Sequence, residues 1–149
     1  MAEYIVTMSR EIDAPAEKVY GIVADYVNGH PRILPPKYFT GLQVEKGGVG
    51  DGTIIRFGMK VMGKEYITRA AVTEPEPGRV LVETDLEGYV TTTFTTDPIG
   101  AGRSRMTFST RGRTRAGGIL GALEKWFAVR FLPRVYTDEL ALLAAEATR

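Results

Sequence analysis

The stretch IDAPAEKVYGIVADY, residues 12–26, decides the fold because it places a short helix directly after a strand. Asp13 can cap the N-terminus of this helix, and Pro15 suits its first turn. Apolar residues then recur at helical spacing and predict a helix over about residues 15–25. The preceding residues 3–12 alternate between apolar and polar side chains, which is typical of a half-buried strand.

The sequence after this helix predicts a series of hairpins. Residues 26–38 contain Gly29 and three prolines, so they predict a loop with one short helical turn. Six strand-like segments follow, separated by glycine- and proline-rich turns. They cover roughly residues 39–47, 53–62, 64–74, 79–87, 89–97 and 103–114. Connections this short join neighbouring strands as antiparallel pairs.

The C-terminal segment from Gly117 predicts one long helix. Its apolar stripe consists of Ile119, Leu120, Leu123, Phe127 and Phe131. Pro133 lacks a backbone N–H and predicts a kink or break at about residues 129–133. The predicted fold class is α+β, in one domain over residues 1–149. In it, the C-terminal helix covers the apolar face of a seven-stranded antiparallel sheet, and two short helices follow the first strand.

Composition narrows the chemistry. The 149 residues, 44% hydrophobic and 25% charged, suit one globular domain. The absence of cysteine and the single histidine exclude thiolate chemistry and a multi-histidine metal site. Nucleotide-binding, hydrolase and zinc motifs are absent, so we expect no cofactor and no metal. A formal charge of +1 gives no general attraction to nucleic acid. The N-terminus has no signal-like segment, and no apolar run reaches the roughly 18 residues of a membrane span, so we expect a cytoplasmic location.

The element order resembles the helix-grip superfamily, also called START-like or SRPBCC, in its polyketide cyclase/dehydrase-like branch. The residues that carry this match are Ile12, Ala14, Pro15, Val19, Tyr20, Gly50, Gly52 and Thr53, together with the segment GRSRMTFSTRG at 102–112. The resemblance implies a curved sheet around the C-terminal helix, with an elongated cavity that binds a hydrophobic or amphipathic small molecule. These motifs are structural, so they imply a fold more strongly than a function.

The predicted ligand site is this cavity, provided that the apolar face of each strand points inward. Its wall would include Met8, Phe57, Met59, Val72, Val82, Leu86, Phe94 and Phe108, and the helix would cover it with Leu120, Leu123, Phe127 and Phe131. An ordinary packed core is the alternative for each of these residues.

A polar set shares the predicted inward faces. Arg10 lies on the face of Val6 and Met8, and it could hold a carboxylate or an enolate if it points inward. Tyr66 could then donate a hydrogen bond or a proton. Alternatively, Arg10 reaches water at the end of its strand. Five threonines have the same predicted orientation, which β-propensity alone explains: Thr68, Thr84, Thr92, Thr96 and Thr110.

The loop around His30 is a further candidate. His30 has the only side chain whose unperturbed pKa lies near neutrality, but no fixed spacing links it to a nucleophile or an acid, and a surface position is the expectation. The apolar residues of the loop predict a lid over the cavity, and packing on the long helix is the alternative. They are Ile33, Leu34, Pro35, Pro36, Tyr38 and Phe39.

An arginine cluster marks the last strand. Its members are Arg103, Arg105, Arg111, Arg113 and Arg115, of which the first four fall on the outer face by parity. Such a face suits an anionic membrane surface or nucleic acid. A solvated face paired with Glu83, Asp85 and Glu87 is the simpler interpretation, and the absence of interleaved aromatic residues weakens the case for nucleic acid.

Three functions follow as hypotheses. The first is binding or carriage of a hydrophobic small molecule, of the lipid, isoprenoid or polyketide class. The second is a cofactor-independent polyketide cyclase/dehydrase, acting by chain positioning and acid/base assistance. The third is a protein-interaction module. Few ionisable groups are predicted to face inward, which favours binding over catalysis. Peripheral membrane contact through the Arg103–Arg115 face and a homodimer stay open as partners.

Overall fold

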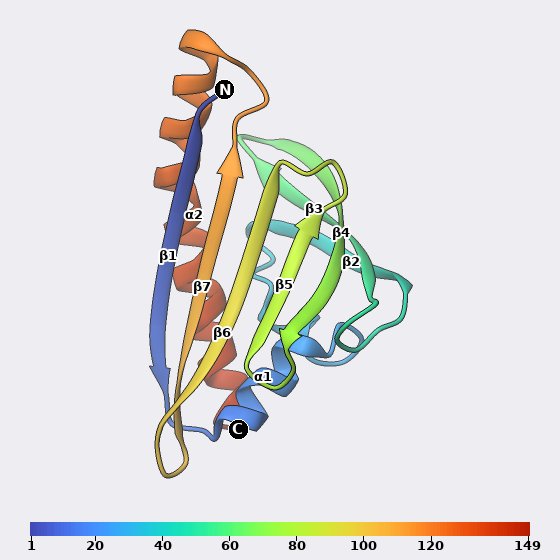
Figure 1. The fold of residues 1–149 in the computed structure, drawn as a ribbon, viewed down its shortest axis with the longest axis vertical. Helices are drawn as coiled ribbons and strands as arrows, with labels where there is room; N and C mark the ends of the chain where they lie inside the picture. The colour runs from blue at the N-terminus through green and yellow to red at the C-terminus, as the bar shows by residue number, and fades with distance from the viewer.

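One antiparallel sheet and one long helix dominate the computed structural model, which describes residues 1–149 (Figure 1). The elements are β1 (Glu3–Ile12), α1 (Ala16–Ala24), the 3₁₀ helix η1 (His30–Ile33), β2 (Phe39–Lys46), β3 (Ile54–Val61), β4 (Lys64–Glu76), β5 (Val80–Asp85), β6 (Val90–Gly100), β7 (Arg103–Arg113) and α2 (Gly118–Ala147). The fold class is therefore the predicted helix-grip arrangement. None of the helices is long and apolar enough to cross a membrane.

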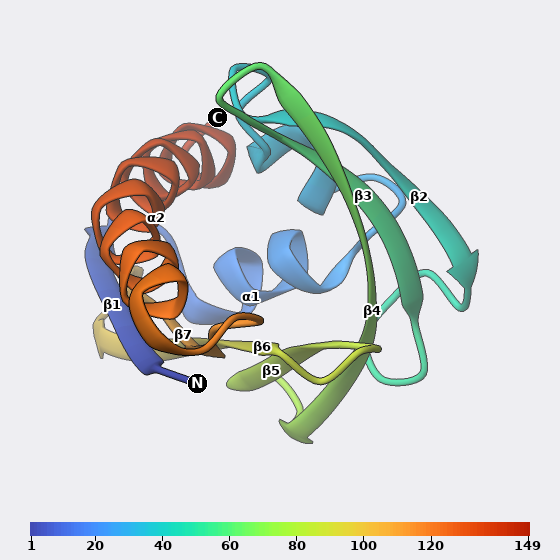
Figure 2. The same cartoon turned by 90° about the horizontal axis from the view of Figure 1, so that it is seen from above.

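The strand order is β1-β7-β6-β5-β4-β3-β2, so the hairpins from β2 to β7 lie side by side and β1 joins the last strand. Figure 2 shows the sheet curving around an interior, with α2 along one side and α1 at the far end. The core lies on the concave face. Strand β7 shows the pattern clearly, because Met106 and Phe108 are fully buried while Arg103, Arg105 and Arg111 on the opposite face are exposed.

Strand β5 faces the opposite way from the prediction. Leu81 pairs with the buried Phe94 of β6, and residues directly opposite in an antiparallel pair share a face. Leu81, Glu83 and Asp85 therefore point to the concave side. The prediction that Val82, Leu86 and Thr84 face inward was wrong, and Leu86 is 47% exposed.

Helix α2 also differs from the prediction. It is a single helix over Gly118–Ala147 with Pro133 inside it, so of the kink or break expected near residues 129–133 the break does not occur. Its N-terminal turns extend past the sheet (Figure 1), so the side chains there have no strand beneath them. Leu120 and Leu123 are consequently exposed and do not cover the interior.

Candidate functional site

A cavity of about 210 Å³ lies between the concave face of the sheet and α2. Its apolar lining comes from β2, β3, β6, α2 and the loop before β2: Leu34, Phe39, Leu42, Ile55, Phe57, Met59, Val90, Phe94 and Leu132. This volume is smaller than the roughly 300–1,000 Å³ of common ligand pockets. The cavity therefore suits a compact ligand.

A polar cluster built from three parts of the chain lies at this cavity. Glu83 reaches it from the inward face of β5, and its Oε2 accepts a 2.5 Å hydrogen bond from the Tyr26 hydroxyl. His30 Nε2 lies 3.7 Å from the same oxygen. The His30 Nδ1 donates a 2.7 Å hydrogen bond to the Val23 carbonyl, because a carbonyl can only accept. The imidazole is thereby fixed with Nε2 toward Glu83, and it stacks on Tyr26 with ring centroids 4.5 Å apart.

Glu139 is the second carboxyl group at the cavity. It projects from α2, is 4% exposed and makes no hydrogen bond to a protein group. No fully enclosed side-chain oxygen lacks a partner, so the Glu139 carboxyl opens on the cavity. Burial raises the pKa of Glu139 well above its usual value, and the nearby charge of Glu83 raises it further. The protonated form is favoured, which places an O–H donor in apolar surroundings.

Hydroxyl groups continue the polar wall beyond the two acids. The Tyr136 hydroxyl, which also lines the cavity, is hydrogen-bonded to Thr110. Thr110 in turn lies 2.9 Å from the hydroxyl of Thr92. Burial raises the pKa values of Tyr136 and Tyr26, so both phenols keep their protons. The wall thus offers neutral hydrogen-bonding groups.

The only arginine at the cavity is already paired. Arg115 Nη2 donates a 2.6 Å hydrogen bond to Glu87, and its guanidinium lies over the Tyr89 ring, 4.2 Å from the centroid. Asp85 nearby accepts the backbone N–H groups of Glu87 and Tyr89 at 2.8 and 3.2 Å. No unpaired arginine or lysine therefore lines the cavity.

The predicted ligand residues are dispersed in the structure. Phe57, Met59 and Phe94 line the cavity, as expected. Phe108 and Tyr38 are buried in the core, whereas Met8 and Phe127 are half-buried beside it. Five others do not line the cavity. Val82 lies on the convex face, and Leu120 and Leu123 are exposed on the free part of α2. Arg10 and Tyr66 pair with the inward-facing Met106 and Met59, but both are exposed and lie outside the lining.

His30 is 3% exposed, so the expectation of a surface position was wrong. It is buried because Tyr26 and the Val23 carbonyl hold it against the interior. The rest of the loop that contains His30 partly lines the cavity and partly packs on α2. Leu34 and Phe39 line the cavity, while Tyr38 packs edge-on against Phe131 of α2.

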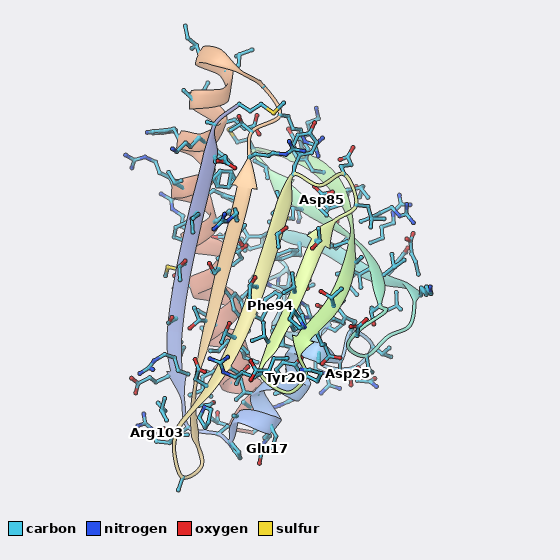
Figure 3. The ribbon with its side chains drawn as sticks, in the orientation of Figure 1. Glu17, Tyr20, Asp25, Asp85, Phe94 and Arg103 are labelled. Atoms are coloured by element: carbon cyan, nitrogen blue, oxygen red, sulfur yellow. The ribbon has the colours of Figure 1, made fainter.

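The arginines of β7 form a paired outer surface at one end. Arg103 binds Glu11 and Asp13, and Arg105 also binds Glu11. The prediction that Glu83 and Asp85 pair with these arginines was wrong, because both acids point to the concave side of the sheet. Figure 3 shows Arg103 near the foot of the sheet, far from Asp85.

The sequence analysis placed none of the three acids that line the cavity, Glu83, Asp85 and Glu139, inside it. Glu139 carries a usable signal, because it lies four residues after Val135 and four before Leu143, within the apolar stripe of α2. A carboxyl group within the apolar stripe of a helix is expected to be buried together with the apolar residues of that stripe. Glu83 carries no comparable signal, because the residues before it are apolar on both faces.

Fold and cavity together define a class: a helix-grip protein with an internal cavity whose mostly apolar wall contains the carboxyl groups of Glu83, Asp85 and Glu139. The chain belongs to the family described as polyketide cyclase/dehydrase and lipid transport, whose model matches residues 4–148. No curated protein matches the chain. The family indicates a protein that binds a hydrophobic ligand.

Three solved structures show the likeness. The KanY protein is 27% identical, with a TM-score of 0.84 over 100% of both chains. The ZhuI aromatase/cyclase from Streptomyces sp. R1128 is 22% identical, with a TM-score of 0.79 over 99% of this chain and 95% of that one. A START superfamily protein from Mycobacterium smegmatis is 14% identical, with a TM-score of 0.72 over 97% of each chain. The last two likenesses show the fold alone.

Proposed function

We propose that the protein binds a compact, neutral hydrophobic molecule that carries a carbonyl or hydroxyl oxygen. One observation carries this proposal: Glu139 is 4% exposed, makes no hydrogen bond to a protein group, and lines a cavity whose wall is mostly apolar. A buried polar group without a partner is costly. A ligand oxygen that accepts the Glu139 proton in a hydrogen bond removes that cost.

The charges around the cavity favour a neutral ligand. Glu83 is held by Tyr26 and faces His30, whereas Arg115 is engaged by Glu87. A carboxylate entering this cavity would lose its hydration without gaining a cation, and it would lie beside Glu83. Arg10 is exposed and is absent from the lining, so it supplies no anchor for an acidic head group.

The size of the cavity favours a ring system over a long acyl chain. A volume of about 210 Å³ holds a small fused-ring molecule more readily than an extended lipid. Phe57, Met59 and Phe94 supply flat or adaptable apolar contacts for such rings. Among the classes that the family description covers, we therefore propose a polyketide-like ligand.

An acid/base enzyme is the second candidate, and the carboxyl pair favours it. Two carboxyl groups whose surroundings separate their proton affinities can serve as acid and base. Glu139 would protonate a departing hydroxyl of a cyclised chain, and Glu83 would remove the proton from the adjacent carbon. The products of that step are an alkene and water. The cavity would increase the reaction rate by holding the substrate chain in one conformation.

Native mass spectrometry of the protein purified from its own host tests the binding proposal. The expected result is a bound neutral molecule with oxygen substituents and fused rings. A bound fatty acid would contradict the proposal. For the enzyme, Glu139→Gln separates the two roles, because glutamine can donate a hydrogen bond but cannot transfer a proton. A binding protein keeps its ligand in this variant, whereas an enzyme keeps binding and loses turnover.

A further inference from the structure

The outer side of the N-terminal half of α2 is apolar and uncovered. We define the outer α2 face by Ile119, Leu120, Leu123 and Trp126, which are 88%, 68%, 59% and 53% exposed. Ile119, Leu123 and Trp126 are spaced four and three residues apart and so lie on one side of the helix, whereas Gly121 lies on its buried side. Figure 1 shows the first turns of α2 reaching beyond the end of the sheet. Contiguous exposed apolar residues of this kind mark a contact surface.

Basic side chains surround this face without acidic partners. Lys125 and Arg130 lie on the same helix, and neither has a carboxylate within ion-pair distance. The Arg130 guanidinium instead lies 4.8 Å from the centroid of the Trp126 ring. The only carboxylate in the N-terminal half of the helix is Glu124, which accepts the backbone N–H of Arg115 at 3.0 Å and so turns back toward the loop.

A shallow groove lies beside the face, between α2 and the edge strand β1. It is lined by Glu3, Tyr4, Ile5, Arg111, Lys125 and Val129. Ile5 of β1 is 59% exposed there, and Arg111 has no carboxylate partner. The arginines of β7 therefore divide into two groups. Arg103 and Arg105 are neutralised by acids at one end, whereas Arg111 remains unpaired at the end next to α2.

We propose that the outer α2 face docks on an anionic lipid surface. Leucine, isoleucine and tryptophan side chains enter the boundary between headgroups and acyl chains. Arg130 reaches the phosphates from the same face, and Lys125 and Arg111 reach them from its flank next to β1. A second copy of the chain fits this face less well. Symmetric docking would place the same basic residues, Lys125, Arg130 and Arg111, on both sides of the interface, and like charges at an interface oppose association. The proposal does not depend on which ligand the cavity holds.

Trp126 makes the proposal directly measurable, because it is the only tryptophan of the chain. Its fluorescence is recorded with vesicles of phosphatidylcholine alone and with vesicles of phosphatidylcholine and phosphatidylglycerol at a 7:3 ratio. We expect a blue shift with the anionic vesicles only, reversed by high salt. Unchanged emission with both vesicle types would overturn the proposal.

Variants locate the contact. Arg111→Gln and Lys125→Gln should each weaken vesicle partitioning about five-fold, the scale for one cation near an anionic surface. Leu123→Glu and Ile119→Glu should abolish it, and a thermal melt confirms that each variant is folded. Arg103→Gln is the matched control, because that arginine is already paired with acids. Equal loss in the control would overturn the proposal. So would a wild-type dimer that Leu123→Glu converts to a monomer without vesicles, because a second copy would then cover the face.

Discussion

The Tyr26 hydroxyl donates a 2.5 Å hydrogen bond to Glu83, and this bond joins the segment after α1 to a central strand of the sheet. It holds a carboxylate at the cavity that would otherwise be poorly satisfied in an apolar interior. The stacked His30 completes the arrangement from the other side. The polar end of the cavity is therefore built from residues distant in the sequence.

Replacing Tyr26 with phenylalanine tests this bond, and the chain offers a matched control. Tyr20 donates an equally short 2.5 Å hydrogen bond to Glu74, but neither of these residues lines the cavity. Tyr26→Phe and Tyr20→Phe should each lower the free energy of unfolding by about 1.5–3 kcal/mol, the range for a hydrogen bond to a charged group. Urea denaturation measures this loss. Only Tyr26→Phe should change the affinity for a neutral ligand such as 2-naphthol. Equal weakening by Tyr20→Phe would contradict the assignment.

Glu139 predicts a pH dependence of stability. The pKa of Glu139 is raised in the folded state above its usual value of 4.5, so the folded protein holds this proton more tightly than the unfolded chain does. This contribution to stability is full below the unfolded pKa and is lost as the pH rises through the folded pKa. Glu139→Gln removes this pH-dependent contribution to stability, because glutamine does not titrate.

The expected result is a stability difference that grows with pH. Between pH 5 and pH 8, wild type should lose stability relative to Glu139→Gln, and thermal melts at several pH values measure this. Leu140→Met is a matched control, because it changes a buried neighbour on α2 without adding or removing a titrating group. A difference between wild type and Glu139→Gln that stays constant with pH would show that Glu139 is not buried as a neutral acid.

The strands and helices were largely predictable because their signals are local. Strand β1 was predicted with its observed ends, since its apolar and polar residues alternate from Glu3 to Ile12. The orientation of β5 was not predictable in this way. Val80, Leu81 and Val82 are apolar on both faces, so the pairing of Leu81 with Phe94 determines which face is buried.

The acids of the cavity depend on partners that the sequence does not reveal. Glu83 is tolerated inside because Tyr26, which is 57 positions away, donates to it. His30 is buried through the Val23 carbonyl, which depends on how α1 turns into η1. Hydrophobicity assigns each of these polar residues to the surface. Tertiary hydrogen bonds reverse that assignment.

The turn that positions His30 is sensitive to one methyl group. A Cβ at Gly29 would overlap the backbone carbonyl of Ile22, which cannot move without distorting α1. Gly29→Ala should therefore destabilise the protein by about 1–3 kcal/mol, the scale for overpacking. Gly21→Ala is the control in the same segment, because a Cβ there meets nothing within 4 Å. It should stabilise α1 by about 0.5–1 kcal/mol. Urea denaturation that gives both variants the same sign would contradict this account of the turn.

Arg10 should be dispensable for both binding and stability. It is exposed on β1 and makes no ion pair. Arg10→Met should leave the affinity for neutral and anionic ligands unchanged and alter the free energy of unfolding by less than about 0.5 kcal/mol, as for most surface positions. Titration calorimetry and urea denaturation measure the two effects. Selective loss of an acidic ligand would return Arg10 to the binding site.

Titration calorimetry with 2-naphthol and 2-naphthoate compares a neutral and an anionic ligand of nearly the same shape in the cavity. Wild type should bind 2-naphthol, and it should bind 2-naphthoate at least about ten-fold more weakly, because the carboxylate finds no cation and lies beside Glu83. Glu83→Gln should narrow this difference by raising the affinity for 2-naphthoate. Equal or tighter binding of 2-naphthoate by wild type would contradict a cavity built for neutral ligands.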